Sequence, residues 1–258
     1  MKIGVIGAGA IANFLFEKIN EQQQENLRIN SVFVRNKEKY KHLESKYAVN
    51  LYTELDEFLD SDIDIVVEAA NITTVECLLP TILKKKDAIV ISIGAFADST
   101  LLAEVSNLIS EYKNNVYLSS GAIGGLDLLQ NAHALGTVDK VTLTTRKPAK
   151  TLIEKEITSE RVVFEGKAVD AIKLFPRNMN VSIVLSLAGL GIDFTNVRLI
   201  ADPHIDKNIH QIEIVGDFGE ATFTITNNPL PENPRTSYLA AMSILGTLKR
   251  INYNFKIG

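Results

Sequence analysis

The first sixteen residues constrain the fold of this chain more than any other segment. Ile3–Ile6 form a short apolar run that ends at Gly7, Gly9 precedes a stretch with helical spacing, and Ala12 stands where such motifs often have a third glycine. A buried strand, a tight glycine turn and a helix in this order form the phosphate-binding unit of dinucleotide-binding folds, because the first N–H groups and the dipole of the helix attract a pyrophosphate. The segment predicts an NAD or NADP site. The expected contacts are Gly7, Gly9, Ala10 and Ile11.

A secretory leader is the main alternative for this segment, because Lys2 is followed by an apolar stretch. Two observations favour the nucleotide site instead. The glycines interrupt the apolar core that a leader needs, and Asn13, Glu17 and Lys18 make the following helix amphipathic.

Length and composition favour a globular enzyme with one large domain or two modest ones. The chain has 258 residues, of which 46% are hydrophobic and 22% charged, enough to bury a substantial core. The longest nearly apolar run, Val181–Ile192, contains two serines and two glycines and is shorter than the roughly 20 residues that span a bilayer. The net charge is −4 and no basic stripe follows the sequence, so we expect neither a membrane segment nor a nucleic-acid partner.

Cysteine and histidine usage points to a reducing compartment and to no bound metal. Cys77 is the one cysteine, so the chain forms no internal disulfide, which is typical of a cytoplasmic protein. The histidines lack the close helical spacing of a zinc site. They stand at positions 42, 133, 204 and 210.

Apolar runs alternate with helical patterns in the first half of the chain. The expected strands after the first are Leu27–Val34, Val49–Tyr52, Ile63–Val67, Ala88–Ile91 and Val116–Leu118, and the expected helices include Thr73–Lys85 and Ser99–Tyr112. This pattern predicts an α/β fold with a Rossmann-type, doubly wound parallel sheet over residues 1–118. The strings Val67–Asn71 and Ser92–Ala95 follow two of these strands, at the carboxyl edge where such sheets bind ligands. Ordinary packing of small residues explains them equally well.

The cofactor preference depends on the end of the second strand. NAD enzymes usually have an acidic residue there that binds the ribose 2′-hydroxyl, whereas this chain has Arg35 and Lys37. Both side chains can pair with the 2′-phosphate of NADP. We therefore expect NADP to be accepted at least as well as NAD, although two solvated charges at a helix start would look the same.

After Leu118 the strands become longer and alternate in hydrophobicity. The expected strands are Val138–Arg146, Asn196–Ala201, His210–Val215 and Ala221–Thr226, and the expected helices are Leu126–Leu135 and Asn178–Leu190. Residues 119–233 are therefore predicted to form a second, α+β domain with a mostly antiparallel sheet, for substrate binding and oligomerisation. We expect the last helix, Thr236–Arg250 within residues 234–258, to pack back on the nucleotide domain. An exposed sheet face commonly pairs, so we expect a homodimer.

Five strings in one order carry a family resemblance. They are Ser119–Asp127, Phe175–Val181, Ala201–Pro203, Asn208–Ile212 with Gly216–Gly219, and Asn233–Ser237. Together they resemble the L-aspartate dehydrogenase family, and the resemblance extends over essentially the whole chain, including Gly7–Ala12 and Ile93–Asp98. Two departures concern the cofactor. Ala8 replaces a cysteine common in the family's glycine turn, and the acidic residue after the second strand is missing.

The resemblance implies oxidation of L-aspartate at its α-carbon to iminoaspartate, which water converts to oxaloacetate and ammonia, with a hydride passing to NAD or NADP. In such families the product can feed NAD biosynthesis. The resemblance further implies that His210 is catalytic and that Ala122 and Asn180 contact the cofactor.

Elementary chemistry makes His210 a sensible base apart from the resemblance. An ammonium group must lose a proton before hydride can leave the neighbouring carbon, and histidine titrates near neutrality. Asn208 lies two residues earlier, on the same face of a strand, and is expected to contact the substrate. We expect His204 to be a loop residue and His133 a packing residue on an apolar helix face. The cations available for the substrate carboxylates are Arg146, Lys147, Arg177 and Arg235, and the sequence does not choose among them.

Two other functions fit a dinucleotide domain joined to an α+β domain. The first is an NADPH-dependent reductase of a semialdehyde or cyclic imine, but such enzymes generally use a lysine or paired histidines. The second is a redox sensor that binds NADP(H) without catalysis, which would have no need of His210.

Overall fold

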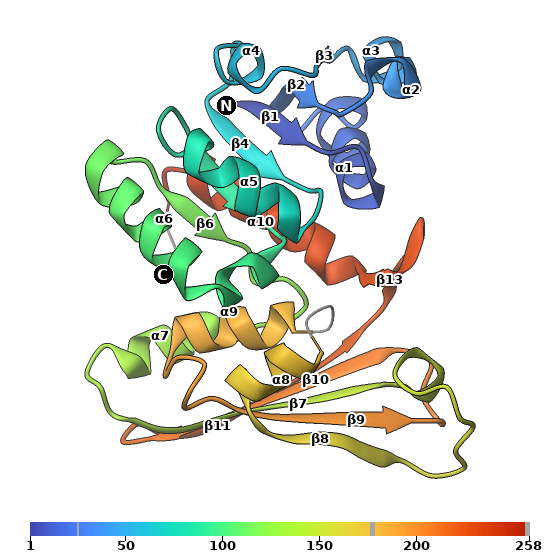
Figure 1. Cartoon of the computed structure of the whole chain (residues 1–258), viewed down its shortest axis with the longest axis vertical. Helices are drawn as coiled ribbons and strands as arrows, with labels where there is room; N and C mark the ends of the chain where they lie inside the picture. The colour runs from blue at the N-terminus through green and yellow to red at the C-terminus, as the bar shows by residue number, and fades with distance from the viewer. Residues whose placement is uncertain (25, 176–178, 256–258) are drawn as a thin grey trace. The chain divides into compact units, whose positions relative to one another are not determined.

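The computed structural model describes residues 1–24, 26–175 and 179–255 and divides into two compact units (Figure 1). The first unit contains Met1–Ser119 together with the C-terminal segment from Ala241. The second unit contains Ser120–Ala240. In the described residues no helix is both long and apolar enough to cross a bilayer.

The first unit is built on a six-stranded parallel sheet in the order β3-β2-β1-β4-β5-β6. The strands are β1 (Lys2–Ile6), β2 (Arg28–Phe33), β3 (Asn50–Tyr52), β4 (Ile65–Glu68), β5 (Asp87–Val90) and β6 (Val116–Leu118). The strand order reverses between β1 and β4, which is the switch point at which doubly wound sheets bind ligands. The predicted Rossmann-type fold is confirmed.

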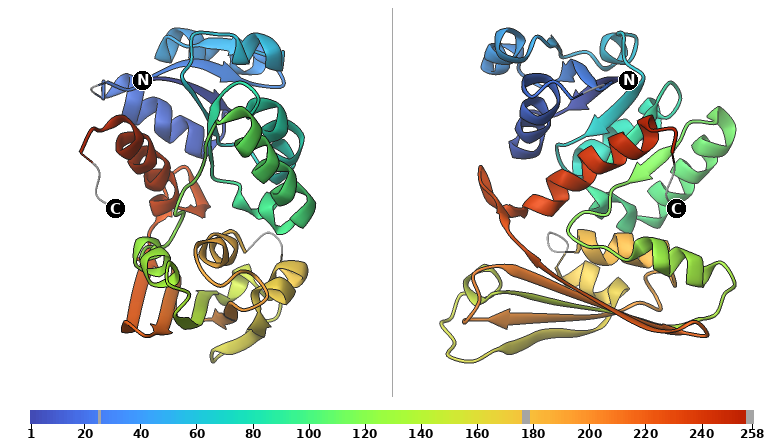
Figure 2. Two further views of the ribbon diagram at one scale, coloured as in Figure 1. Left: turned by 90° about the vertical axis from the view of Figure 1, so that its left-hand side faces the viewer. Right: turned by 180° about the vertical axis from the view of Figure 1, so that it is seen from behind.

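Helices cover both faces of this sheet. They are α1 (Ala10–Leu15), continued by the π-helical η1 (Phe16–Glu21), α2 (Lys37–Tyr40), α3 (His42–Tyr47), α4 (Leu55–Leu59), α5 (Ile72–Ile82), η2 (Ile93–Ala97), α6 (Ser99–Tyr112) and α10 (Tyr238–Asn252). Figure 2 shows α1 in blue and α10 in red on one face, and α5 and α6 in green on the other. The central strand β4 is consequently buried along its whole length, as its continuous apolar run predicts.

A buried glutamate joins the ends of β4 and β5. Glu68 is 3% exposed, and its Oε1 accepts hydrogen bonds from Ala70 N (2.8 Å) and Ser92 Oγ (2.9 Å). Its Oε2 accepts from Ser92 N (3.0 Å) and Ile91 N (3.3 Å). Burial raises the pKa of this carboxyl, and the donated hydrogen bonds oppose that rise. One side chain thus holds together the two strings that the sequence places at the carboxyl edge.

The second unit has a five-stranded sheet in the order β11-β10-β7-β9-β8. The strands are β7 (Val138–Pro148), β8 (Arg161–Lys167), β9 (Asn196–Asp202), β10 (Asn208–Gly216) and β11 (Gly219–Asn227). The β7–β9 pair is parallel and the other pairs are antiparallel, which confirms the expected, mostly antiparallel sheet. A two-stranded hairpin, β12 (Pro229–Leu230) and β13 (Asn233–Ser237), leads into α10.

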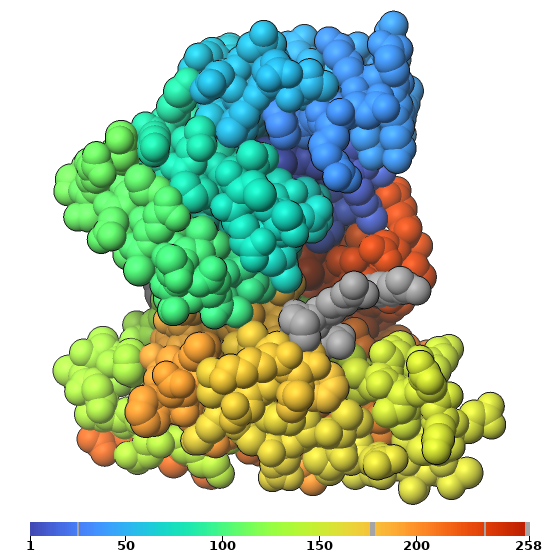
Figure 3. All heavy atoms as spheres, viewed as in Figure 1, coloured from blue at the N-terminus to red at the C-terminus, as the bar shows by residue number. Residues whose placement is uncertain are grey.

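Three helices lie on one face of this sheet: α7 (Leu126–His133), α8 (Ala168–Leu174) and α9 (Asn180–Ala188), with a short 3₁₀ turn, η3 (Ala149–Thr151), after β7. The strand β8 and the helix α8 were not expected from the sequence. In the space-filling view they form the yellow surface of this unit (Figure 3), and β8 has no buried residue. A strand with no buried face lacks the apolar alternation by which strands are recognised.

Replacing Glu68 with glutamine tests whether its hydrogen bonds hold the ends of β4 and β5 together. The amide keeps the shape but has one acceptor oxygen, so at least one backbone N–H of the four donors will face the amide nitrogen. We expect the free energy of unfolding to fall by about 1–3 kcal/mol, the cost of an unsatisfied buried donor. Denaturant unfolding measures this loss, and Glu76→Gln on the exposed side of α5 is the control. Equal stability of the two variants would contradict a stabilising role for the Glu68 hydrogen bonds.

Candidate functional site

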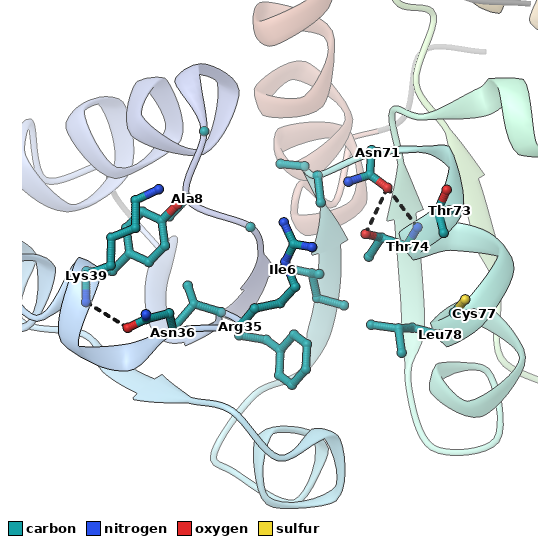
Figure 4. A pocket seen from close by; sticks show the side chains of 17 residues that line it. Ile6, Ala8, Arg35, Asn36, Lys39, Asn71, Thr73, Thr74, Cys77 and Leu78 are labelled. Carbon is teal, nitrogen blue, oxygen red and sulfur yellow. Dashed lines mark hydrogen bonds between the residues drawn. The ribbon is translucent and has the colours of Figure 1, made fainter.

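A cavity of about 1080 Å³ lies at the carboxyl edge of the first unit's sheet (Figure 4). Three segments line it. The β1–α1 turn supplies Ile6, Gly7, Ala8 and Gly9, the end of β2 with α2 supplies Phe33, Val34, Arg35, Asn36, Lys39 and Tyr40, and the start of α5 with the turn before it supplies Ala69, Ala70, Asn71, Thr73, Thr74, Cys77 and Leu78. The sequence places a pyrophosphate at the first of these segments.

The backbone of the β1–α1 turn leaves room for a bound group. Gly7 has φ +103°, and a Cβ there would lie 2.8 Å from the carbonyl oxygen of Ala69, so only glycine fits. A Cβ on Gly9 would meet nothing within 4 Å, so it would project into open space. Gly9 is the N-cap of α1, whose first residues, Ala10 and Ile11, have N–H groups beyond the reach of the helix's own carbonyls. These features fit a dinucleotide's pyrophosphate.

The charge in this cavity comes from the end of β2 and from α2. Arg35 and Lys39 are the charged members of the described lining, and Figure 4 shows the Arg35 guanidinium extending toward the middle of the cavity. Asn36 caps α2 by accepting a hydrogen bond from Lys39 N at 3.0 Å. Lys37, the predicted second cation, does not line the cavity. Its Nζ lies 3.6 Å from Oε1 of Glu44 in an ion pair, because α2 directs this side chain toward α3 and not into the cavity.

The candidate base, His210, lies in the second unit on the face of β10 that the helices cover. It is 4% exposed, and Ile212 and Ile214 on the same face are fully buried. Its Nδ1 is 3.0 Å from the Oγ1 of Thr145, its partner on β7. Burial, and then the positive charge of Lys147, lower the pKa of His210 to about 4. The imidazole is therefore neutral at physiological pH and can accept a proton.

Two of the candidate cations on β7 lie on opposite faces of the sheet, because they are consecutive residues of a strand. Arg146 makes ion pairs with Glu160 and, at 3.4 Å, with Asp202. These pairs raise the pKa of Arg146, with the Glu160 hydrogen bond as the largest cause. Lys147 lies on the face of Thr145, and burial lowers the pKa of its ammonium. Arg177 and the side chain of Arg235 lie outside the described residues.

A second polar group reaches the same face of the sheet from β11. Asn208 on β10 pairs with Asn227, which is 4% exposed and donates a hydrogen bond to the carbonyl oxygen of Ala122 at 3.1 Å. This bond ties the Ser119–Asp127 string to β11, the strand that pairs with the His210 strand β10. Sequence reasoning missed Thr145 and Asn227, since neither stands in a recognisable motif.

The remaining predicted positions are more scattered. Asn180 is the exposed first residue of α9, and residues 176–178, with the expected start of that helix, lie outside the described residues. His204 is exposed in the turn after β9, where its N–H donates to Asp202 Oδ1 at 2.9 Å. His133, expected to pack on an apolar face, is instead exposed at the end of α7. Across the described part of the chain, no group of three or more His, Cys, Asp or Glu side chains is arranged to hold a metal ion.

Two family models match the chain, one in each half. Residues 7–119 match the NAD-binding domain of homoserine dehydrogenase. Residues 127–251 match the C-terminal domain of aspartate dehydrogenase.

Relatives match over the full length. The chain is 39% identical over 272 residues to an L-aspartate dehydrogenase of Methanococcoides burtonii and 36% identical over 268 residues to one of Methanococcus maripaludis. Each alignment covers 100% of this chain and 99% of the relative. The crystal structure of aspartate dehydrogenase from Thermotoga maritima superposes with a TM-score of 0.81 at 32% identity and covers 100% of this chain and 99% of that one.

Arg35 provides the test of cofactor preference. Replacing Arg35 with alanine is expected to weaken NADPH binding about tenfold or more, the usual effect of losing a charged hydrogen bond, and to change NADH binding far less. Fluorescence titration of the two reduced cofactors measures both constants. Lys37→Ala, which removes a cation outside the cavity, is the matched control. Equal weakening of both cofactors by the Arg35 change would remove the case for a 2′-phosphate contact.

Proposed function

The chain belongs to the aspartate dehydrogenase family, and from this premise we propose that it oxidises L-aspartate at the α-carbon, giving iminoaspartate that water converts to oxaloacetate and ammonia. The observation that carries the proposal is the buried, neutral imidazole of His210, oriented by Thr145 on the neighbouring strand. A neutral imidazole has a ring nitrogen with a lone pair that can take a proton from an ammonium substrate.

His210 acts as the base in this proposal. In the proposed tautomer the Nδ1–H donates to Thr145 Oγ1, 3.0 Å away, so the lone pair of the neutral ring is on Nε2, which takes the ammonium proton. The nitrogen of the substrate then has the electron pair that the forming C=N bond requires. Asn208, on the same face of β10, is placed to contact the substrate.

Bound NAD or NADP supplies the acceptor for the hydride that leaves the α-carbon. Gly7 and Gly9 keep the β1–α1 turn open for the pyrophosphate, and the N–H groups of Ala10 and Ile11 face it. Arg35, joined by Lys39, favours the 2′-phosphate of NADP, so the enzyme accepts NADP at least as well as NAD. Ala122 and Asn180 are further proposed cofactor contacts, carried over from the family's motifs.

The wider setting of the enzyme is also a proposal. Iminoaspartate can feed NAD biosynthesis, and a chain with Cys77 alone suits the reducing cytoplasm. The sheet face of the second unit opposite its helices is polar and exposed, with Thr222, Thr224 and Thr226 of β11 open to solvent. This face supports a homodimer, since sheet faces of this kind commonly pair.

Turnover with L-aspartate is the direct test. We expect reduction of NAD or NADP that is stereospecific for L-aspartate, and the reverse reaction with oxaloacetate and ammonia, both followed by absorbance of the reduced nicotinamide. His210→Ala should lower the rate by about 10²–10⁴-fold, the usual contribution of a general base. His204→Ala, at an exposed histidine nearby in the sequence, is the control. Binding of the cofactor without turnover in either direction would favour the semialdehyde reductase or the redox sensor.

The pH dependence follows from the low pKa of His210. Only the neutral imidazole accepts a proton, and the neutral form predominates above the pKa. Because burial lowers this pKa to about 4, kcat/KM should stay level as the pH falls through the ordinary histidine value of about 6.5 and should reach half of its plateau near pH 4. Initial rates at low L-aspartate concentration across this range measure the decline. A midpoint at or above the ordinary value would contradict a desolvated His210 in the substrate-free enzyme.

A further inference from the structure

The register of β7 and β10 places a lysine beside the candidate base. His210 pairs with Thr145 and Ile209 pairs with Arg146, where the printed pairing of the two strands ends, and Lys147 and Asn208 are the next residues of β7 and β10. Thr145 and Lys147 are two residues apart and therefore share the face of the sheet to which His210 belongs. Three polar side chains of two adjacent strands, those of His210, Asn208 and Lys147, thus occupy neighbouring positions on one face.

The surroundings of Lys147 differ from those of an ordinary surface lysine. Its side chain is half-buried, and desolvation lowers the pKa of its ammonium. Among the described charged groups, Lys147 is the one whose charge acts on His210. Facing His210 from the partner strands are the uncharged Thr145 of β7 and Ile225 of β11. A half-buried ammonium next to a neutral imidazole is a favourable place for an anion, because one of its three N–H groups can donate a charge-assisted hydrogen bond to a carboxylate there.

We propose that Lys147 is a substrate-binding residue that pairs with a carboxylate of a dicarboxylic amino acid while His210 receives the ammonium proton. This inference rests on the proposed function. In L-aspartate, one or two carbon–carbon bonds separate the carboxylates from the carbon that carries the ammonium group. Neighbouring strands lie about 4.8 Å apart, so Lys147 and His210 are spaced to contact both ends of such a molecule.

Pairing of Lys147 with a carboxylate also changes the base. Burial and, after it, the charge of Lys147 oppose protonation of His210 and lower its pKa. A bound carboxylate neutralises that charge, so the pKa of His210 rises when the substrate is in place. The proton acceptor therefore becomes stronger at the moment a proton must be taken.

Kinetics of charge-removing variants are the first part of the test. Lys147→Met is expected to raise the KM for L-aspartate about 10- to 100-fold, the range for losing one charged hydrogen bond, with a smaller change in kcat. Lys147→Gln, a second neutral variant, should behave alike, and Lys147→Arg should retain part of the affinity. Lys140→Met, an exposed lysine of the same strand, is the control. An unchanged KM in the folded neutral variants would overturn the inference.

An NMR titration of the His210 imidazole is the second part and needs no turnover. Succinate, a dicarboxylate without an ammonium group, should raise the pKa of His210 in the wild-type protein. In Lys147→Met the pKa should be higher without succinate and insensitive to it. If the wild-type protein does not oxidise L-aspartate, the proposed function fails while this titration still decides the role of Lys147. If succinate leaves the pKa of His210 unchanged in the wild type, the role of Lys147 fails.

Discussion

The contact between His210 and Thr145 across β7 and β10 is the interaction on which the proposed chemistry of the second unit depends. A hydroxyl, and not a carboxylate, holds the imidazole at 3.0 Å, so burial is not offset by a negative partner and the pKa falls. A carboxylate at the Thr145 position would instead favour the imidazolium and raise the pKa of His210. In the proposed function the base is therefore neutral because it is buried and its hydrogen-bond partner is uncharged.

Much of the first unit follows from sequence because its strands are continuous apolar runs. The parallel sheet buries β1 and β4 on both faces, and such runs stand out against the helices between them. The short helices α2, α3 and α4 were not foreseen. They have four to six residues, too few for an apolar periodicity to be recognised. The strand β8 was not predicted for a related reason, since it has no buried face and its residues do not alternate between apolar and polar.

The candidate site likewise contains features that the sequence reveals and features that it does not. The glycine turn and Arg35 are local signals, readable because neighbouring residues in the sequence are neighbours in the cavity. Whether Lys37 or Lys39 lines the cavity depends on how the short helix α2 is oriented about its axis. The sequence does not reveal this orientation, because the two lysines are only two residues apart. Thr145 and Lys147 depended on the register between strands about 65 residues apart, which no local pattern specifies.

The first unit separates two requirements of cofactor binding. The backbone path at Gly7 is fixed by the carbonyl oxygen of Ala69, so that position tolerates no side chain. The side chains of Ala8 and Ala12 are less constrained than that of Gly7. Ala12 is fully buried, so this position needs a small side chain. The charges that we propose to favour NADP come from Arg35 and Lys39, which follow β2 and are not part of the glycine turn. These two residues can therefore change without disturbing the turn, so the backbone geometry of the cavity and its charge are set by different residues.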